Sequence, residues 1–159
     1  MRSHYVRKLI LYEPPVTAQG FLYPPGALAR LKAQLKAGDK EGVVTTFLSE
    51  IVGMPVQEIA FLRSEPSWES RLATTHTILR ELPDEGFIID PQQFRSLLVP
   101  TLLLLGGESM PFLATATEIV HAALRNSRIL VMPGQQHIAM NTAPDLFVHE
   151  VVEFLTEPG

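Results

Sequence analysis

The 159-residue sequence contains no cysteine. This absence excludes disulfide bonds, thiolate nucleophiles and cysteine-ligated metal sites, and it is consistent with a reducing compartment. Basic residues are also few and dispersed: 13 Lys and Arg stand against 17 Asp and Glu, for a formal net charge of -4. A nucleic-acid-binding surface needs a basic stripe to neutralise phosphates. We therefore expect no nucleic-acid partner.

Long hydrophobic runs are absent as well. The longest apolar stretch, Leu97–Leu105, is interrupted by Pro100 and Thr101, and it is far shorter than the roughly 20 residues that a membrane-spanning helix needs. The first ten residues carry basic side chains but no extended apolar segment, unlike a signal peptide. We therefore expect a cytoplasmic protein with no membrane partner.

Three short segments have the composition of strands. Val6–Tyr12 is rich in apolar residues and stops at two prolines, and Arg128–Met132 stops at Pro133. Between them, Pro100–Leu105 is continuously apolar, which is typical of a strand buried on both faces in a parallel sheet. Helical patterns that begin near Pro111 and Pro144 follow the last two segments. The order strand, helix, strand, helix predicts a right-handed crossover and the α/β fold class.

The stretch between residues 24 and 82 has the pattern of several helices instead. Gly38 and Gly53 are expected to end the first two helices, and Asp39 is expected to cap the second. Ser67 is expected to cap a later helix, in which His76 shares a packing face with leucines. This stretch is therefore interpreted as a helical insertion between the first strand and the crossover.

His137 is the first candidate functional residue. It lies in the loop after the third predicted strand, and loops at the carboxyl ends of parallel strands form the ligand crevice of open sheets. It is either a catalytic base or an ordinary surface histidine. Glu108 and Ser109 follow the second predicted strand, Pro100–Leu105, at the same edge, where a carboxylate can hydrogen-bond a histidine ring nitrogen. The alternative is a simple turn in which Ser109 caps the next helix.

Three segments together resemble the C-terminal end of the α/β-hydrolase family: Val99–Glu108, Arg128–His137 with its Pro-Gly-x-x-His turn, and Ala143–Phe147. The opening Val6–Pro15 resembles the family's strand that leads into the lid. The resemblance covers nearly the whole chain. It implies part of a parallel sheet, about three strands, in residues 1–16 and 99–159, with a helical lid and connector in residues 17–98.

The resemblance also implies the roles of site residues. His137 matches the family's general base. The family's acid usually stands in a Gly-x-x-acid pattern, and counting from Gly106 places that position on Ser109, which is not an acid. Glu108, one place earlier, is the expected acid. Three apolar residues near the site are expected to line a pocket for a small apolar ester-like substrate, unless they belong to the core: Met110, Phe112 and Met140. No metal and no cofactor are expected.

The family's nucleophile motif, Gly-x-Ser-x-Gly, does not occur in the sequence. The nearest match, Gly107–Pro111, ends in proline and follows the acid strand rather than a nucleophile elbow. We therefore expect a fragment of an ester or acyl hydrolase that is inactive alone, or one half of a split hydrolase. The alternative is a non-enzymatic module that binds a small ligand or a partner. An open edge on the first strand predicts a homo-oligomer or pairing with a missing N-terminal half.

Overall fold

The computed structural model describes residues 6–16, 23–82, 88 and 90–158. The chain divides into two compact units. The first consists of Met1–Gln19 and Phe87–Gly159, and the second of Gly20–Gly86.

The first unit is built on a three-stranded parallel sheet, which confirms the predicted α/β class. Its strands, in the spatial order β1-β2-β3, are β1 (Leu9–Tyr12), β2 (Thr101–Gly106) and β3 (Ser127–Met132). Because all three strands are parallel, their carboxyl ends lie at one edge of the sheet. Tyr12 pairs in register with Leu104 at that edge.

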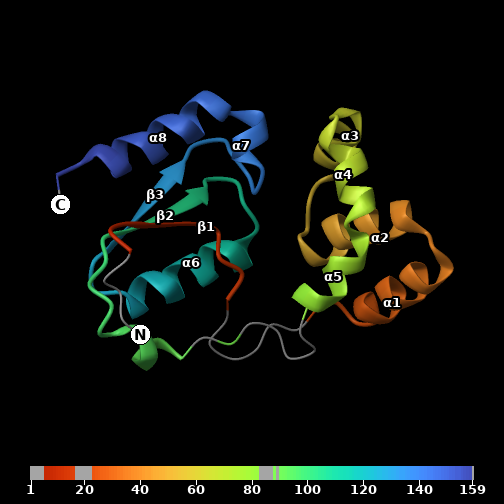
Figure 1. Cartoon of the computed structure of the whole chain (residues 1–159), viewed down its shortest axis with the longest axis horizontal. Coiled ribbons are helices and arrows are strands. Elements are labelled where there is room, and N and C mark those ends of the chain that lie inside the picture. Colours follow the sequence, from red (N-terminus) through yellow and green to blue (C-terminus); the bar gives the residue numbers. More distant parts are fainter. Residues whose placement is uncertain (1–5, 17–22, 83–87, 89, 159) are drawn as a thin grey trace. The chain divides into compact units, whose positions relative to one another are not determined.

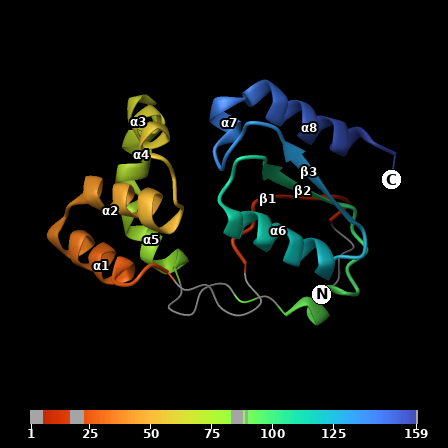
Figure 2. The same cartoon turned by 180° about the vertical axis from the view of Figure 1, so that it is seen from behind.

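Helices cover both faces of this sheet (Figures 1 and 2). One face packs against α8 (Pro144–Thr156) and the other against α6 (Pro111–Ala123). Along β2, Leu102 and Leu104 join the cluster that contains Phe154 of α8, whereas Leu103 joins the cluster on the α6 side. Burial on both faces explains why the β2 sequence is continuously apolar rather than alternating.

The structure adds two short elements that the sequence pattern did not predict. A four-residue helix, α7 (Ala139–Thr142), lies in the segment expected to be a loop, and a 3-10 turn, η2 (Pro91–Phe94), lies in the expected connector. The carbonyl of Ile138 accepts hydrogen bonds from the backbone N–H groups of Asn141 and Thr142. A single turn of this kind is too short to produce a detectable helical period in the sequence.

The second unit is entirely helical in its described part. Its elements are α1 (Ala27–Ala37), α2 (Lys40–Thr46), the π-helical turn η1 (Phe47–Ile51), α3 (Val56–Ser64), α4 (Ser67–Ala73) and α5 (Thr75–Glu81). Gly38, with φ 75°, ends α1, and the Asp39 side chain accepts a hydrogen bond from the Gly42 N–H at the start of α2. Both caps confirm the predictions made for these residues.

The prediction for the later helices was wrong in three respects. The helix expected after Ser67 is interrupted at Thr74, and Ser67 provides no side-chain cap. His76 is exposed in α5 rather than buried on a leucine face.

Trp68 is 7% exposed, and its indole Nε1 donates to Glu41 Oε2 at 3.0 Å. Among the described residues, no helix is both long and apolar enough to span a membrane.

Candidate active site

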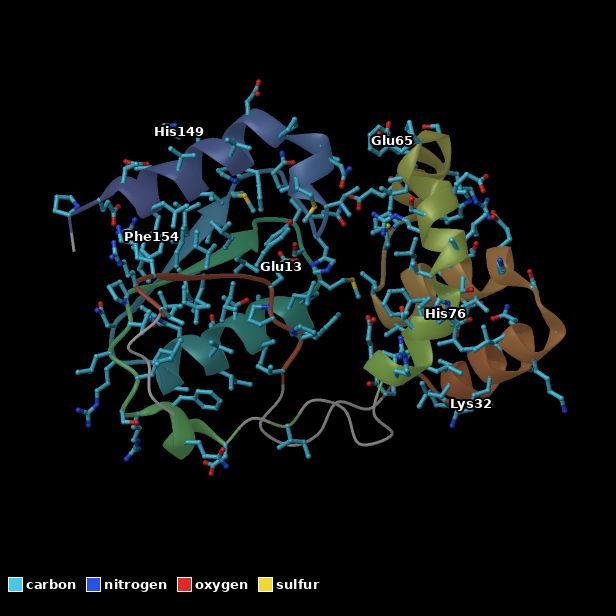
Figure 3. The ribbon with its side chains drawn as sticks, in the orientation of Figure 1. Glu13, Lys32, Glu65, His76, His149 and Phe154 are labelled. Carbon is cyan, nitrogen blue, oxygen red and sulfur yellow. The ribbon has the colours of Figure 1, made fainter. Side chains whose placement is uncertain are left out.

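His137 follows β3 and lies at the edge of the sheet where the strands end. Its Nδ1 is 2.6 Å from Oε2 of Glu13, the residue that immediately follows β1. Figure 3 labels Glu13 at this edge. The two residues are 124 positions apart in the sequence, and the parallel pairing of β1, β2 and β3 brings them together.

Glu13 is fixed at both oxygens of its carboxylate. Oε2 faces His137, and Oε1 accepts a hydrogen bond of 2.7 Å from the backbone N–H of Gly106, at the end of β2. The residue is 0% exposed. A buried carboxylate is stable only when hydrogen bonds or charges compensate its lost hydration. Here the two donors supply this compensation and also fix the direction of the side chain.

The backbone at Glu13 has an unusual conformation, with φ 44°. Positive φ is uncommon outside glycine and costs about 1–3 kcal/mol for other residues. Successive side chains in a strand point to opposite faces, yet Tyr12 and Glu13 both contact the imidazole of His137. The left-handed conformation at the strand end allows both side chains to reach the same ring.

The expected acid, Glu108, is not the carboxylate that the structure brings to His137. The side chain of Glu108 is exposed, and its backbone N–H donates to the carbonyl of Gln135. Ser109, at the position counted from Gly106, has a buried Oγ without a hydrogen-bond partner. The carboxylate beside His137 comes from the end of β1 instead of the end of β2.

Sequence reasoning missed Glu13, although one signal for it exists. Glu13 is the first residue after the first predicted strand, so a parallel sheet places it at the same edge as His137. The Gly-x-x-acid pattern points to the end of the second strand instead, so it does not identify this position. Its backbone conformation was not predictable, since glutamate has no intrinsic preference for positive φ.

The imidazole is accessible on the side away from Glu13. The His137 side chain is 37% exposed, and no hydrogen bond of its Nε2 occurs in the part of the chain that the structure describes. A carboxylate oxygen can only accept, so the bond to Glu13 places the proton of a neutral imidazole on Nδ1. The lone pair on Nε2 is then available to a proton donor. This is the arrangement that a general base requires.

The three residues expected to bind substrate lie in elements next to this edge. Met110 precedes α6 and is 41% exposed, and Met140 in α7 is 43% exposed. Phe112 is partly buried in the first turn of α6. Their role in binding stays a prediction. Among the described residues, no group of three or more His, Asp or Glu side chains is arranged to hold a metal ion.

Comparisons with known proteins bear on the fold that carries this site. No protein-family model and no curated protein sequence matches the chain. Solved structures do: an α/β hydrolase from Sphaerobacter thermophilus superimposes with a TM-score of 0.75 and 29% identity, over 94% of this chain and 58% of that chain. A thermophilic esterase has a TM-score of 0.61 and 23% identity, over 92% and 56% of the two chains.

A third structure extends the range of activities among these neighbours. The 2-hydroxy-6-oxo-6-phenylhexa-2,4-dienoate hydrolase from a Rhodococcus strain has a TM-score of 0.60 and 17% identity, over 94% of this chain and 55% of that chain. The chain thus spans little more than half the length of each of these three structures. The sheet and the helices that cover it match their C-terminal part. The chain therefore has a partial α/β-hydrolase fold.

Proposed function

We propose that this chain supplies the general base of a hydrolase that acts on an ester or a related acyl substrate. The observation that carries the proposal is the His137–Glu13 pair, in which a buried carboxylate holds Nδ1 while Nε2 stays open. Such a pair matches the base and the orienting acid of a nucleophile–histidine–acid triad. Glu13 acts as a positioning residue, since it contacts His137 rather than a reacting atom.

The proposed reaction uses His137 twice. Nε2 first takes the proton of a nucleophilic hydroxyl, whose oxygen forms a bond to the acyl carbon of the substrate. The bond between that carbon and the leaving group then breaks, and the leaving group takes the proton from Nε2. A water molecule repeats the sequence and releases the acid. Glu13 stabilises the imidazolium of each step through the hydrogen bond to Nδ1.

The nucleophile in this proposal comes from polypeptide outside these 159 residues. The sequence has no Gly-x-Ser-x-Gly motif, and Ser109 Oγ is buried without a hydrogen-bond partner. The backbone amides of an oxyanion hole would come from the same outside polypeptide. The chain alone is then inactive.

The substrate pocket is proposed to form at the carboxyl edge of the sheet. Met110 and Met140 offer exposed apolar surface in the elements that border His137, and Phe112 stands two residues after Met110. An apolar lining with few polar groups is typical of small-molecule sites. The helices of Gly20–Gly86 are proposed to be the lid of the hydrolase.

The test is fluorophosphonate labelling followed by intact mass. The chain alone should give no adduct. Co-expression with the part of the Sphaerobacter thermophilus hydrolase that this chain does not cover should give an adduct on that part. His137→Ala should abolish that adduct, whereas His149→Ala should not, because His149 is 70% exposed on α8.

Two results would contradict the proposal. An adduct on the chain alone that His137→Ala removes would place a nucleophile within the sequence. An adduct in the assembled pair that survives His137→Ala would show that His137 is not the base. Both results can be read from the same mass spectra.

A second candidate function is that of a partner-binding module. In the described residues β1 is the strand at the edge of the sheet, next to β2, and an edge strand can pair with another strand. Sedimentation of the purified chain tests this candidate. A concentration-dependent dimer supports pairing with a second copy, and a monomer at all concentrations excludes it.

A further inference from the structure

Tyr12, the last residue of β1, makes more contacts with the His137 segment than the proposed mechanism requires. Its hydroxyl donates to the carbonyl of Gln136, and it accepts a hydrogen bond of 3.1 Å from the N–H of Ala139. These two backbone groups lie on either side of His137 in the sequence. A single hydroxyl therefore joins the chain before the histidine to the chain after it.

The Ala139 N–H is a group that needs such a partner. Ala139 is the first residue of α7 and is 0% exposed. The first N–H groups of a helix have no acceptor within the helix, and a buried N–H without an acceptor costs about 1–3 kcal/mol. The Tyr12 hydroxyl supplies the acceptor, so it stabilises the start of α7 next to the histidine.

The ring of Tyr12 also covers one face of the imidazole. The two ring centroids are 5.6 Å apart, and the planes are inclined by 26°. Stacking of this kind restricts rotation of the imidazole about its bond to Cβ, because rotation would drive the ring edge into the tyrosine. The phenol and the Glu13 carboxylate thus restrain the same imidazole, one at its face and the other at Nδ1.

Tyr12 is itself held by the core of the first unit. Its ring meets Phe147 of α8 at 5.5 Å with an angle of 58°, and it packs against the buried cluster that includes Leu104 and Met132. A side chain anchored in this way transmits the rigidity of the sheet to the histidine loop. Solvent-exposed contacts could not do this, because they would move with the loop.

We propose that Tyr12 is a positioning residue that keeps His137 directed at Glu13, through its hydroxyl on the loop backbone and its ring on the imidazole. This inference rests on the proposed role of His137 as the base. It adds a second orienting residue, adjacent in sequence to the first, so that one strand end orients the histidine completely. Tyr12 would not contact the substrate or the nucleophile.

The test uses the chain by itself, so its outcome is independent of whether a nucleophile completes the site. Proton NMR of the unmodified chain should show a slowly exchanging imidazole N–H signal from His137 Nδ1, and the Ala139 amide should be protected from exchange. Tyr12→Phe keeps the ring and removes the hydroxyl. It should speed exchange of the Ala139 amide about two- to tenfold, the loss of one hydrogen bond, and broaden the imidazole signal.

Two further variants separate the parts of the argument. Tyr12→Leu removes the stacked ring as well and should abolish the imidazole signal in the folded chain. Tyr23→Phe removes a tyrosine hydroxyl that belongs to the other unit and should change neither readout. The inference is overturned if Tyr12→Phe behaves like Tyr23→Phe. It is also overturned, without any variant, if the unmodified chain shows neither the imidazole signal nor a protected Ala139 amide.

Discussion

Replacing Glu13 by Gln changes one carboxylate oxygen to an amide nitrogen at constant side-chain volume, in a site that is 0% exposed. The Gly106 N–H must still find an acceptor, so the amide oxygen takes the place of Oε1. The amide NH₂ then faces His137 Nδ1, which must accept instead of donate. The proton of the neutral imidazole consequently moves to Nε2, the nitrogen that a base needs to keep free.

The expected loss of stability in Glu13→Gln follows from the two hydrogen bonds that the Glu13 carboxylate accepts. Hydrogen bonds to a charged group contribute about 1.5–3 kcal/mol and neutral ones about 0.5–1.5 kcal/mol, so converting both lowers the free energy of unfolding by about 1–3 kcal/mol. The chain stays folded, because both bonds persist in neutral form. In an assembled enzyme the wrong tautomer should reduce kcat by about 10⁴-fold, as the equivalent change does in serine proteases.

Long-range ¹H–¹⁵N correlation spectra of the imidazole distinguish the two tautomers directly. The chain has five histidines, and the spectrum of His137→Ala assigns the relevant one. The matched control is Glu108→Gln, an equal change at an exposed carboxylate. The reasoning is refuted if folded Glu13→Gln keeps the proton on Nδ1. It is equally refuted if Glu108→Gln produces the tautomer switch, since Glu108 would then be the orienting acid.

Three further predictions concern stability. Glu13→Ala removes the acceptor of two donors and leaves φ 44° on a residue with a Cβ, whereas Glu13→Gly tolerates that backbone conformation. Denaturant titration should therefore find the Gly variant more stable than the Ala variant by about 1–2 kcal/mol. Equal stabilities of the two variants would argue against backbone strain at this position. Gly106→Ala would place a Cβ 2.5 Å from the Gln135 carbonyl oxygen and 2.4 Å from Ser109 Oγ. Thermal unfolding should show that the free energy of unfolding falls by about 1–3 kcal/mol. An unchanged midpoint would mean that the loop carrying Gln135 moves away from the new methyl group at no cost. The Arg128 guanidinium, hydrogen-bonded to Glu157, lowers the pKa of the Glu157 carboxyl, so the stability from this pair is present above the ordinary glutamate pKa and is lost as pH falls through the lowered pKa. The difference in Tm between the unmodified chain and Glu157→Gln should therefore vanish in acid. A difference that persists in acid would contradict a stabilising ion pair between Arg128 and Glu157.

The parts of the fold that were predictable from sequence are those with a strong local cause. The apolar run of β2 reflects burial on both faces, and Pro111 and Pro144 begin helices where their missing N–H groups cost nothing. The interruption at Thr74 was not predictable, because no glycine or proline marks it. There the Thr74 hydroxyl bonds the carbonyls of Ser70 and Arg71, a local competition with the helix that the pattern of apolar residues does not reveal.

The candidate site also contains one residue whose place was predictable from the sequence and one whose contact was not. His137 was predictable because a strand, a Pro-Gly turn and a helix define its place within a few residues. Its carboxylate partner was predictable only in so far as Glu13 follows a strand of the same sheet, because the contact itself depends on the register of β1 with β2 and on a left-handed backbone at Glu13. The strand register and this backbone conformation are properties of the assembled sheet, and the residue types around position 13 do not indicate either of them.

The long sequence separation between Glu13 and His137 has a consequence for how the chain folds. The contacts that join β1 to β2 and Glu13 to His137 close loops of 92 and 124 residues, and the entropy of closing a loop grows with its length. The helices of Gly20–Gly86 contact one another over shorter sequence separations than these two, and contacts at shorter separations form faster than distant ones. The residues after β1 can thus become ordered while β1 still lacks its neighbour. We therefore expect Glu13 to join His137 late in folding, so that formation of this contact reports that the first unit has completed its assembly.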